Sequence, residues 1–237
     1  MTPAARDTAL HALLPVERLL RRADPAAVPD LLELRVALES TAGRTVTRGR
    51  AARFLALTQT SVDRWIADGA IPTVIDIDGK TMVPTRELVR LRVEMDAARW
   101  QGAQRPLGVV VRQRRTAAAA LPVETFIVPS GDVRHGHRRA EITDLAVHRL
   151  IEHGLTPLEI AIAQWQLETA RAEGRLHPSW YSAWREVFDA GEDRIHAMLV
   201  EDSADAASLR QTSPFKGQAR HEDRRRLFDA LDAERAA

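Results

Sequence analysis

Residues 45–100 carry an ordered series of helix starts and stops, and this series is the strongest constraint on the fold. Thr47 can cap a first short helix, and Thr60 or Ser61 can cap a second. Gly69 can end the second helix by adopting a left-handed backbone. The side chains expected to face inward are Ala51, Ala52, Phe54 and Leu55 in the first helix, and Val62, Trp65 and Ile66 in the second.

A hairpin and a longer helix complete this series. The pair Asp78-Gly79 separates two short runs of strand-forming residues, which is a strong hairpin signal. Pro84 closes the second strand, and Thr85 can cap a charged helix over 86–100. The apolar face expected for that helix contains Leu88, Leu91 and Met95, with either Val93 or Val89.

Most of the chain outside this segment is also predicted to be helical, so the expected fold class is mainly α, with four successive segments. Residues 1–43 form an N-terminal helical segment of two short helices, with Pro15 as a kink or division. Residues 44–100 form a helix–turn–helix with a short β-hairpin. Residues 101–137 form an Arg-rich linker with a short strand at 123–128, and residues 138–237 an all-helical C-terminal interaction domain.

The segment 45–90 resembles the excisionase-type, MerR-like winged helix–turn–helix family. The residues that carry the resemblance are Val46-Thr47, Arg50-Ala51-Ala52-Arg53-Phe54-Leu55, Val62-Asp63-Arg64-Trp65-Ile66, Gly69-Ala70-Ile71-Pro72, Val83-Pro84 and Leu88. The resemblance implies that the second helix is a recognition helix and that the hairpin is a wing. Three departures stand out: Arg50 replaces a glutamate, Ala56 replaces the turn glycine, and Asp76 and Asp78 stand where basic wing residues are common.

The resemblance implies a set of DNA-contacting residues. Polar side chains at the start of the recognition helix would face DNA, with Arg64 reading guanine. Arginines of the scaffold helix would lie near phosphates, and Lys80 is the wing candidate. The expected DNA-binding residues are Arg48, Arg50, Arg53, Thr58, Gln59, Thr60, Ser61, Arg64 and Lys80.

Positive charge is concentrated in the middle of the chain. Residues 44–115 contain 14 Lys and Arg against 7 Asp and Glu, whereas residues 116–237 contain 15 against 20. A local excess of cations favours a polyanionic partner. The basic stretch 105–115 is either an arm that follows a DNA backbone or a solvated linker.

Composition argues against several other classes of function. The 237 residues include no cysteine, which excludes disulfides, cysteine-bound zinc and thiol nucleophiles. The histidine pairs His135/His137 and His148/His153 lack metal-site spacing, and no catalytic motif is visible. We therefore expect neither enzymatic activity nor a cofactor or metal. The sequence lacks a long apolar run and a signal-peptide layout, so we expect a cytoplasmic protein without a membrane segment.

The leading interpretation is a sequence-specific transcriptional regulator that binds double-stranded DNA, as a homodimer in the layout usual for the family. The segment 208–217 is similar to the tail of actinobacterial helix–turn–helix proteins, some of which are antitoxin-like. That similarity implies an autorepressing antitoxin of a toxin–antitoxin system, whose C-terminal half binds a cognate toxin or another protein. Two alternatives are an excisionase-like architectural recombination factor and a protein-interaction module that uses the helix–turn–helix as a scaffold.

Overall fold

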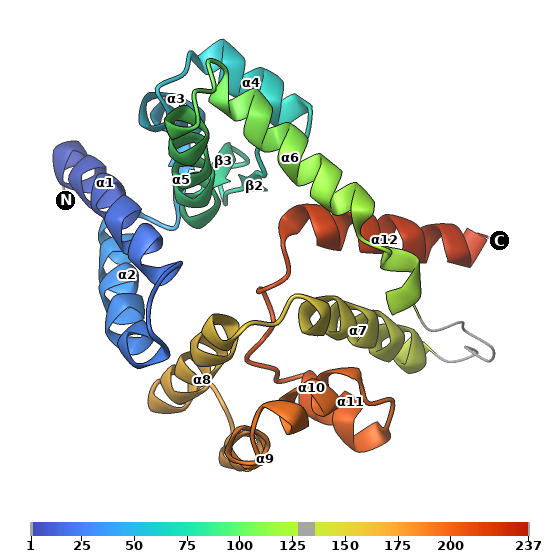
Figure 1. Ribbon diagram of the computed structural model, residues 1–237. Coiled ribbons are helices and arrows are strands. Elements are labelled where there is room, and N and C mark those ends of the chain that lie inside the picture. Colours follow the sequence, from blue (N-terminus) through green and yellow to red (C-terminus); the bar gives the residue numbers. More distant parts are fainter. Residues whose placement is uncertain (1, 128–135, 237) are drawn as a thin grey trace. The chain divides into compact units, whose positions relative to one another are not determined.

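The computed structural model describes residues 2–127 and 136–236, which contain twelve α-helices and one three-stranded antiparallel sheet (Figure 1). They form two compact units, Met1–Arg115 (unit 1) and Thr116–Ala237 (unit 2). The elements that begin in unit 1 are α1 (Pro3–Leu20), the 3₁₀ turn η1 (Pro25–Ala27), α2 (Val28–Ala42), β1 (Thr45–Thr47), α3 (Arg48–Leu55), α4 (Gln59–Ala67), β2 (Val74–Ile75), β3 (Thr81–Pro84), α5 (Thr85–Trp100) and α6 (Pro106–Ala120). The elements of unit 2 are η2 (Val123–Phe126), α7 (Gly136–His153), α8 (Pro157–Ala172), α9 (Pro178–Asp189), α10 (Glu192–Val200), α11 (Ala204–Arg210) and α12 (His221–Ala236).

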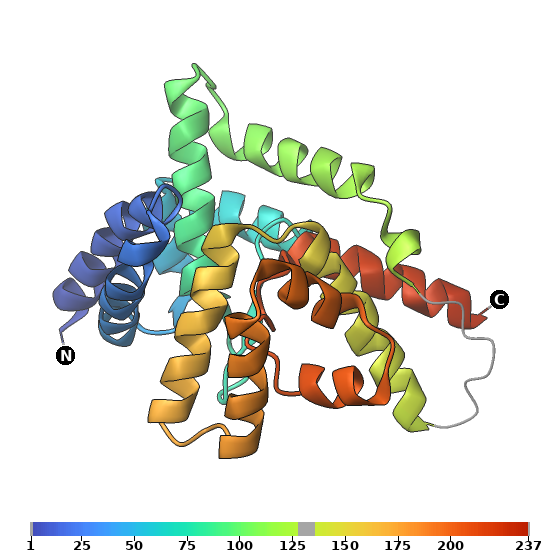
Figure 2. The same ribbon diagram turned by 60° about the horizontal axis from the view of Figure 1, so that its bottom comes forward.

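The first two helices lie side by side, as both views show (Figures 1 and 2). Pro15 does not divide the first helix, because α1 continues through this residue to Leu20. A proline inside a helix removes one backbone hydrogen bond. The buried side of α1, which includes Leu10, Leu13 and Val16, compensates by packing the helix on both sides of the proline.

One hydrophobic core runs through the whole of unit 1. It contains Leu10 of α1 and Ala42 of α2 together with residues of α3, α4, the sheet and α5. It also contains Leu107 and Val110 of α6. The N-terminal helices therefore pack onto the segment that follows residue 43 and share its core.

Residues 101–115 of the predicted Arg-rich linker also belong to this unit. Residues 106–120 form α6, and three apolar side chains at helical spacing, Leu107, Val110 and Val111, are buried. The predicted strand at 123–128 is wrong as well. Thr125 N donates to Pro122 O at 3.0 Å and closes the 3₁₀ turn η2, while residue 128 lies outside the described residues.

The predicted hairpin is confirmed, and a third strand joins it. β2 and β3 pair antiparallel with Val74 opposite Met82, and Gly79 in the turn has a φ of 74°. β1 pairs with the other edge of β3, with Val46 opposite Val83. The sheet order is therefore β1-β3-β2. Its buried residues Val46 and Val83 attach the sheet to the unit 1 core.

Aromatic side chains of α9 and of the segment after α11 pack together in the core of unit 2. Trp184 and Phe188 of α9 lie with ring centroids 6.2 Å apart. Phe215, from the segment after α11, lies 5.9 Å from Trp184 and 5.7 Å from Phe188. Trp184 and Phe215 are fully buried, so these contacts hold the 211–220 segment against α9.

His148 of α7 is fully buried in unit 2 among charged groups. Its Nδ1 lies 2.7 Å from Asp144 O and must carry the proton, because a carbonyl oxygen only accepts. Its Nε2 is buried without a partner among the described residues. Burial lowers the pKa of His148 below 6.5; Arg210 and Lys216 lower it further, and Asp144 opposes them.

We expect this histidine to make the protein less stable in acid. The folded state keeps His148 neutral, so below about pH 6.5 the unfolded state takes up the proton more readily. The stabilisation is complete above that pH and is lost as the pH falls. Urea unfolding between about pH 7.5 and 5.5 should show a flatter pH dependence for His148→Gln than for the natural protein. The exposed His221→Gln serves as the control and should leave the pH dependence unchanged; equal curves for His148→Gln and the natural protein would contradict the expectation.

The connection between α3 and α4 holds a non-glycine residue in a left-handed conformation. Ala56 has φ 55° and ψ 49°, and it is the only described non-glycine residue with positive φ. The Cβ of an L-residue is crowded in this conformation, so the turn stores strain.

Ala56→Gly is therefore expected to stabilise the protein by roughly 0.5–1 kcal/mol. Relief of roughly 1–2 kcal/mol of left-handed strain outweighs the roughly 0.4–1 kcal/mol entropic cost of a glycine in the unfolded chain. Ala97→Gly, on the exposed side of α5, is the matched control and should destabilise by about 1 kcal/mol. Urea unfolding measures both, and a loss of stability for both variants would show that Ala56 is unstrained.

Candidate nucleic-acid interface

The helices α3 and α4 present one side to the core and the other to solvent. Residues 56–58 connect them, and Val62 of α4 is fully buried. Gln59, Thr60 and Arg64 are exposed on the opposite side of α4. The predicted inward side chains are buried, namely Ala51, Ala52, Phe54, Leu55 and Val62, or partly buried against the same core, namely Trp65 and Ile66. We call Gln59, Thr60, Asp63 and Arg64 the α4 outer face.

The helix α4 starts earlier than the sequence indicated. Thr58, rather than Thr60 or Ser61, is the N-cap, and its Oγ1 accepts from Ser61 N at 3.2 Å. The two hydroxyl groups also bond to each other, with Thr58 Oγ1 donating to Ser61 Oγ at 2.9 Å. These two predicted contact residues therefore stabilise the start of the helix. The first turn leaves the side chains of Gln59 and Thr60 exposed.

Two predicted arginines are exposed and carry uncompensated charge. Arg64 lies on α4, and its guanidinium carbon is 5.5 Å from the centroid of the Trp65 ring. Arg53 lies on α3. Neither forms an ion pair with any residue within 2–127 or 136–236. Both guanidinium groups are therefore available to an anionic partner.

Arg48 lies at the start of α3 and forms an ion pair with a residue of the α4 outer face. Its Nη1 lies 3.2 Å from Oδ1 of Asp63, and both side chains are exposed. An exposed pair of this kind contributes at most about 1 kcal/mol to stability. A phosphate could therefore replace Asp63 as the partner of Arg48 at little cost.

Arg50 does not belong to the exposed surface. Its side chain is only 13% exposed, with Nε 2.6 Å from Oδ1 of Asp7 in α1 and Nη1 3.2 Å from Ala42 O at the end of α2. The expectation that Arg50 lies near a phosphate is corrected by this geometry. Its guanidinium group instead joins α3 to the two N-terminal helices, which the local sequence pattern could not reveal.

The hairpin carries little positive charge. Lys80 Nζ lies 3.4 Å from Oδ2 of Asp78. Asp76 Oδ1 accepts from the backbone N–H groups of Asp78 and Lys80, at 2.9 and 2.8 Å, and so shapes the turn. Beside it, Ile75 and Ile77 are exposed by 67% and 104%. The hairpin is therefore apolar and weakly acidic.

Among the described residues, no group of three or more His, Asp or Glu side chains is placed to hold a metal ion. His135 and the side chain of His137 lie outside the described part of the chain. His148 is buried, and the ring of His153 packs against Phe126 at 5.4 Å. His148 and His153 therefore both pack within unit 2.

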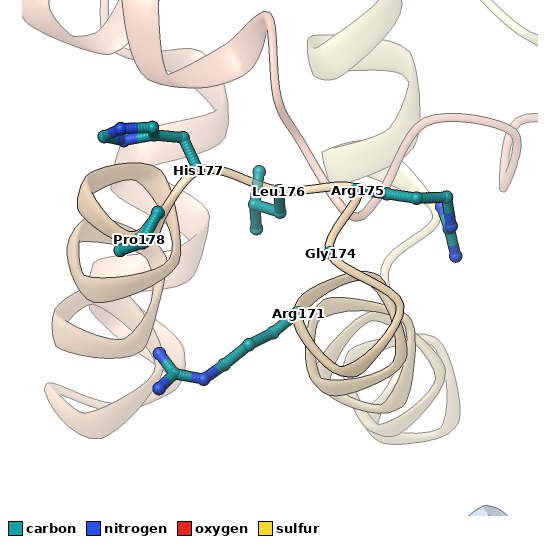
Figure 3. Close-up of a pocket in the computed structure, with 6 residues that line it drawn as sticks. All are labelled: Arg171, Gly174, Arg175, Leu176, His177 and Pro178. Atoms are coloured by element: carbon teal, nitrogen blue, oxygen red, sulfur yellow. The ribbon is translucent and has the colours of Figure 1, made fainter.

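A hollow in unit 2 lies at the turn between α8 and α9 (Figure 3). The basic side chains of Arg171, Arg175 and His177 point in different directions from it. Arg171 lies over the ring of Tyr181 at 4.2 Å, Arg175 pairs with Glu173, and His177 caps α9. These groups are engaged locally and do not converge on a common point.

Comparison of the chain with models of protein families, with curated proteins and with solved structures found no match. Within residues 2–127 and 136–236, no helix combines the length and the hydropathy needed to cross a lipid bilayer. Function is therefore inferred from the geometry and charge of the chain's own residues, with the α4 outer face as the candidate site.

The contrast between Arg50 and Arg53 gives a direct test of this assignment on one helix. Arg50→Met should lower the free energy of unfolding by about 1–3 kcal/mol, because Ala42 O and Asp7 lose their hydrogen-bond donor. Arg53→Met removes an exposed charge and should change it by less than about 0.5 kcal/mol. Urea unfolding distinguishes the two, and equal losses would contradict the structural role of Arg50.

Proposed function

We propose that this chain is a sequence-specific DNA-binding regulator, in which α3 and α4 act as a helix–turn–helix and β2–β3 as the wing. The proposal rests chiefly on the α4 outer face, which is polar and exposed while the opposite side of α4 is buried. With its side chains, an α-helix such as α4 is about 10–12 Å in diameter. A helix of this size can lie in the major groove of DNA, which is about 12 Å wide.

Three side chains of the α4 outer face are proposed to read bases. Arg64 can donate two hydrogen bonds to guanine O6 and N7, and Gln59 can bond to adenine N6 and N7. Thr60 can contact either type of base edge. Gln59 and Thr60 lie in the first turn of α4, where recognition helices contact base edges.

Phosphate contacts are assigned to α3. Arg53 has no competing partner among the described residues, and Arg48 is held only by an exposed pair with Asp63. Such contacts position a protein on DNA and make its affinity depend on salt. Arg50 is excluded from this set, since it holds Asp7 and Ala42 O.

The hairpin supports a second candidate function, a contact with another protein. Its only cation, Lys80, is paired with Asp78, so a wing contact to phosphate gains little charge. Its exposed Val74, Ile75 and Ile77 are better suited to an apolar surface on a protein. This is the interaction-module alternative, with the helix pair as a scaffold.

Unit 2 is assigned to protein contacts within the same proposal. Residues 116–237 carry 15 Lys and Arg against 20 Asp and Glu, and this charge opposes binding to phosphates. The partners that the sequence resemblance implies are a second copy of the chain on a palindromic operator and a cognate toxin bound by the C-terminal half. An autorepressing antitoxin, which binds DNA through one unit and a toxin through the other, is the specific form of regulator that we propose.

Arg64→Ala tests the proposed base reading. A duplex selected from a random pool by the natural protein should bind the variant about 1–3 kcal/mol more weakly, whereas a random duplex should bind it nearly as well as before. Fluorescence anisotropy with both duplexes measures the difference.

Arg22→Ala, which removes another exposed arginine of unit 1 just after α1, serves as the control and should leave both affinities unchanged. An equal loss on both duplexes for Arg64→Ala would show that Arg64 contacts only phosphate. If the natural protein selects no sequence from the pool, the proposed function itself is wrong.

A further inference from the structure

The exposed surface of α4 continues onto α6 through one ion pair. Arg64 and Asp68 are four residues apart, which places them on the same side at the end of α4. Arg115 of α6 binds Asp68, with Nη2 2.6 Å from Oδ2 and 3.2 Å from the backbone carbonyl oxygen. Figure 1 shows α6 passing this end of α4.

A second arginine extends this surface along α6. Arg112 lies three residues before Arg115, about one helical turn away on the adjoining side of the helix. It is exposed and has no ion pair among the residues that the structure describes. We call Arg112 and Arg115 the α6 arginine row.

The orientation of this row is fixed by the other side of α6. Leu107, Val110 and Val111 are buried in the unit 1 core. Arg114 also faces inward, with Nε 2.7 Å from Oε2 of Glu94 in α5. The α6 arginine row therefore cannot turn into the protein without removing these side chains from their contacts.

The sequence around the row contains no competing acid. Residues 97–123 include five arginines and no aspartate or glutamate. Asp68 is thus the acidic residue that contacts the row, and Arg115 Nη2 donates to both its carboxylate and its backbone carbonyl oxygen. A guanidinium group has five N–H donors, so Arg115 keeps others for a second acceptor.

We propose that the α6 arginine row contacts the DNA phosphate backbone beside the groove that α4 enters. This inference rests on the proposed function and extends the interface beyond the residues that resemble a known family. Arg112 supplies an unpaired charge, and Arg115 is positioned by Asp68 next to the end of α4. Phosphates that flank the major groove are the anions that such a row would meet.

The salt dependence of DNA affinity tests the row directly. Each phosphate contact contributes about −0.9 to the slope of log K against log salt concentration. With a random duplex of about 30 base pairs as the probe, Arg112→Ala should make this slope shallower by about 1. Arg112→Lys keeps the charge and should retain the slope, which separates lost charge from altered folding.

The ion pair between Arg115 and Asp68 allows a second, independent test of the row. Asp68→Asn removes a negative charge beside the proposed phosphate and releases Arg115, so the random duplex should bind more tightly. Unchanged or weaker binding by this variant would overturn the assignment of Arg115.

The outcomes distinguish this inference from the proposed function. If the natural protein binds the duplex and Arg112→Ala keeps the full slope, the row does not contact DNA. The row would then suit a contact with an acidic protein, and the proposed function would stand. If the natural protein binds no duplex at any salt concentration, both fail. Arg22→Ala, as the control, should leave the slope unchanged.

Discussion

The burial of one side of α4 determines which residues the helix can offer to a partner. Val62 is fully buried, and Trp65 and Ile66 pack against the same core. Burying one such aliphatic side chain contributes about 1.5–3 kcal/mol, so rotating α4 about its axis would be strongly unfavourable. Gln59 and Arg64 therefore remain exposed without needing any contact of their own.

Arginines in unit 1 have several different roles despite their identical chemistry. Arg50 and Arg114 join helices, whereas Arg53 and Arg64 remain exposed. Arg35 of α2 is buried, and its pKa is lowered to about 10 by burial and by Arg86, while Glu39 opposes the shift. The positive charge counted along the sequence therefore overstates what reaches the surface. The exposed arginines of the proposed interface lie on α3, α4 and α6.

Features set by neighbouring residues could be predicted from the sequence, and features set by distant partners could not. The cap at Thr47, the stop at Gly69 and the Asp78-Gly79 hairpin depend on a few adjacent residues and are confirmed. The partner of Arg50 is Asp7, 43 residues away, and no local pattern indicates it. Likewise, the arginines of 105–115 concealed the spacing of the apolar residues that make this stretch a packed helix. Which of the predicted contact residues were exposed therefore had to come from the structure.

The shared core of unit 1 sets the minimal length of a fragment that contains α4 and folds on its own. A piece beginning at residue 44 would lack Leu10 and Leu13, which lie in the same core as Phe54, and would leave Arg50 without its carboxylate partner. Residues 45–90 are thus shorter than the segment that shares this core. Truncation experiments on α4 should accordingly keep the chain from α1 to the end of α6.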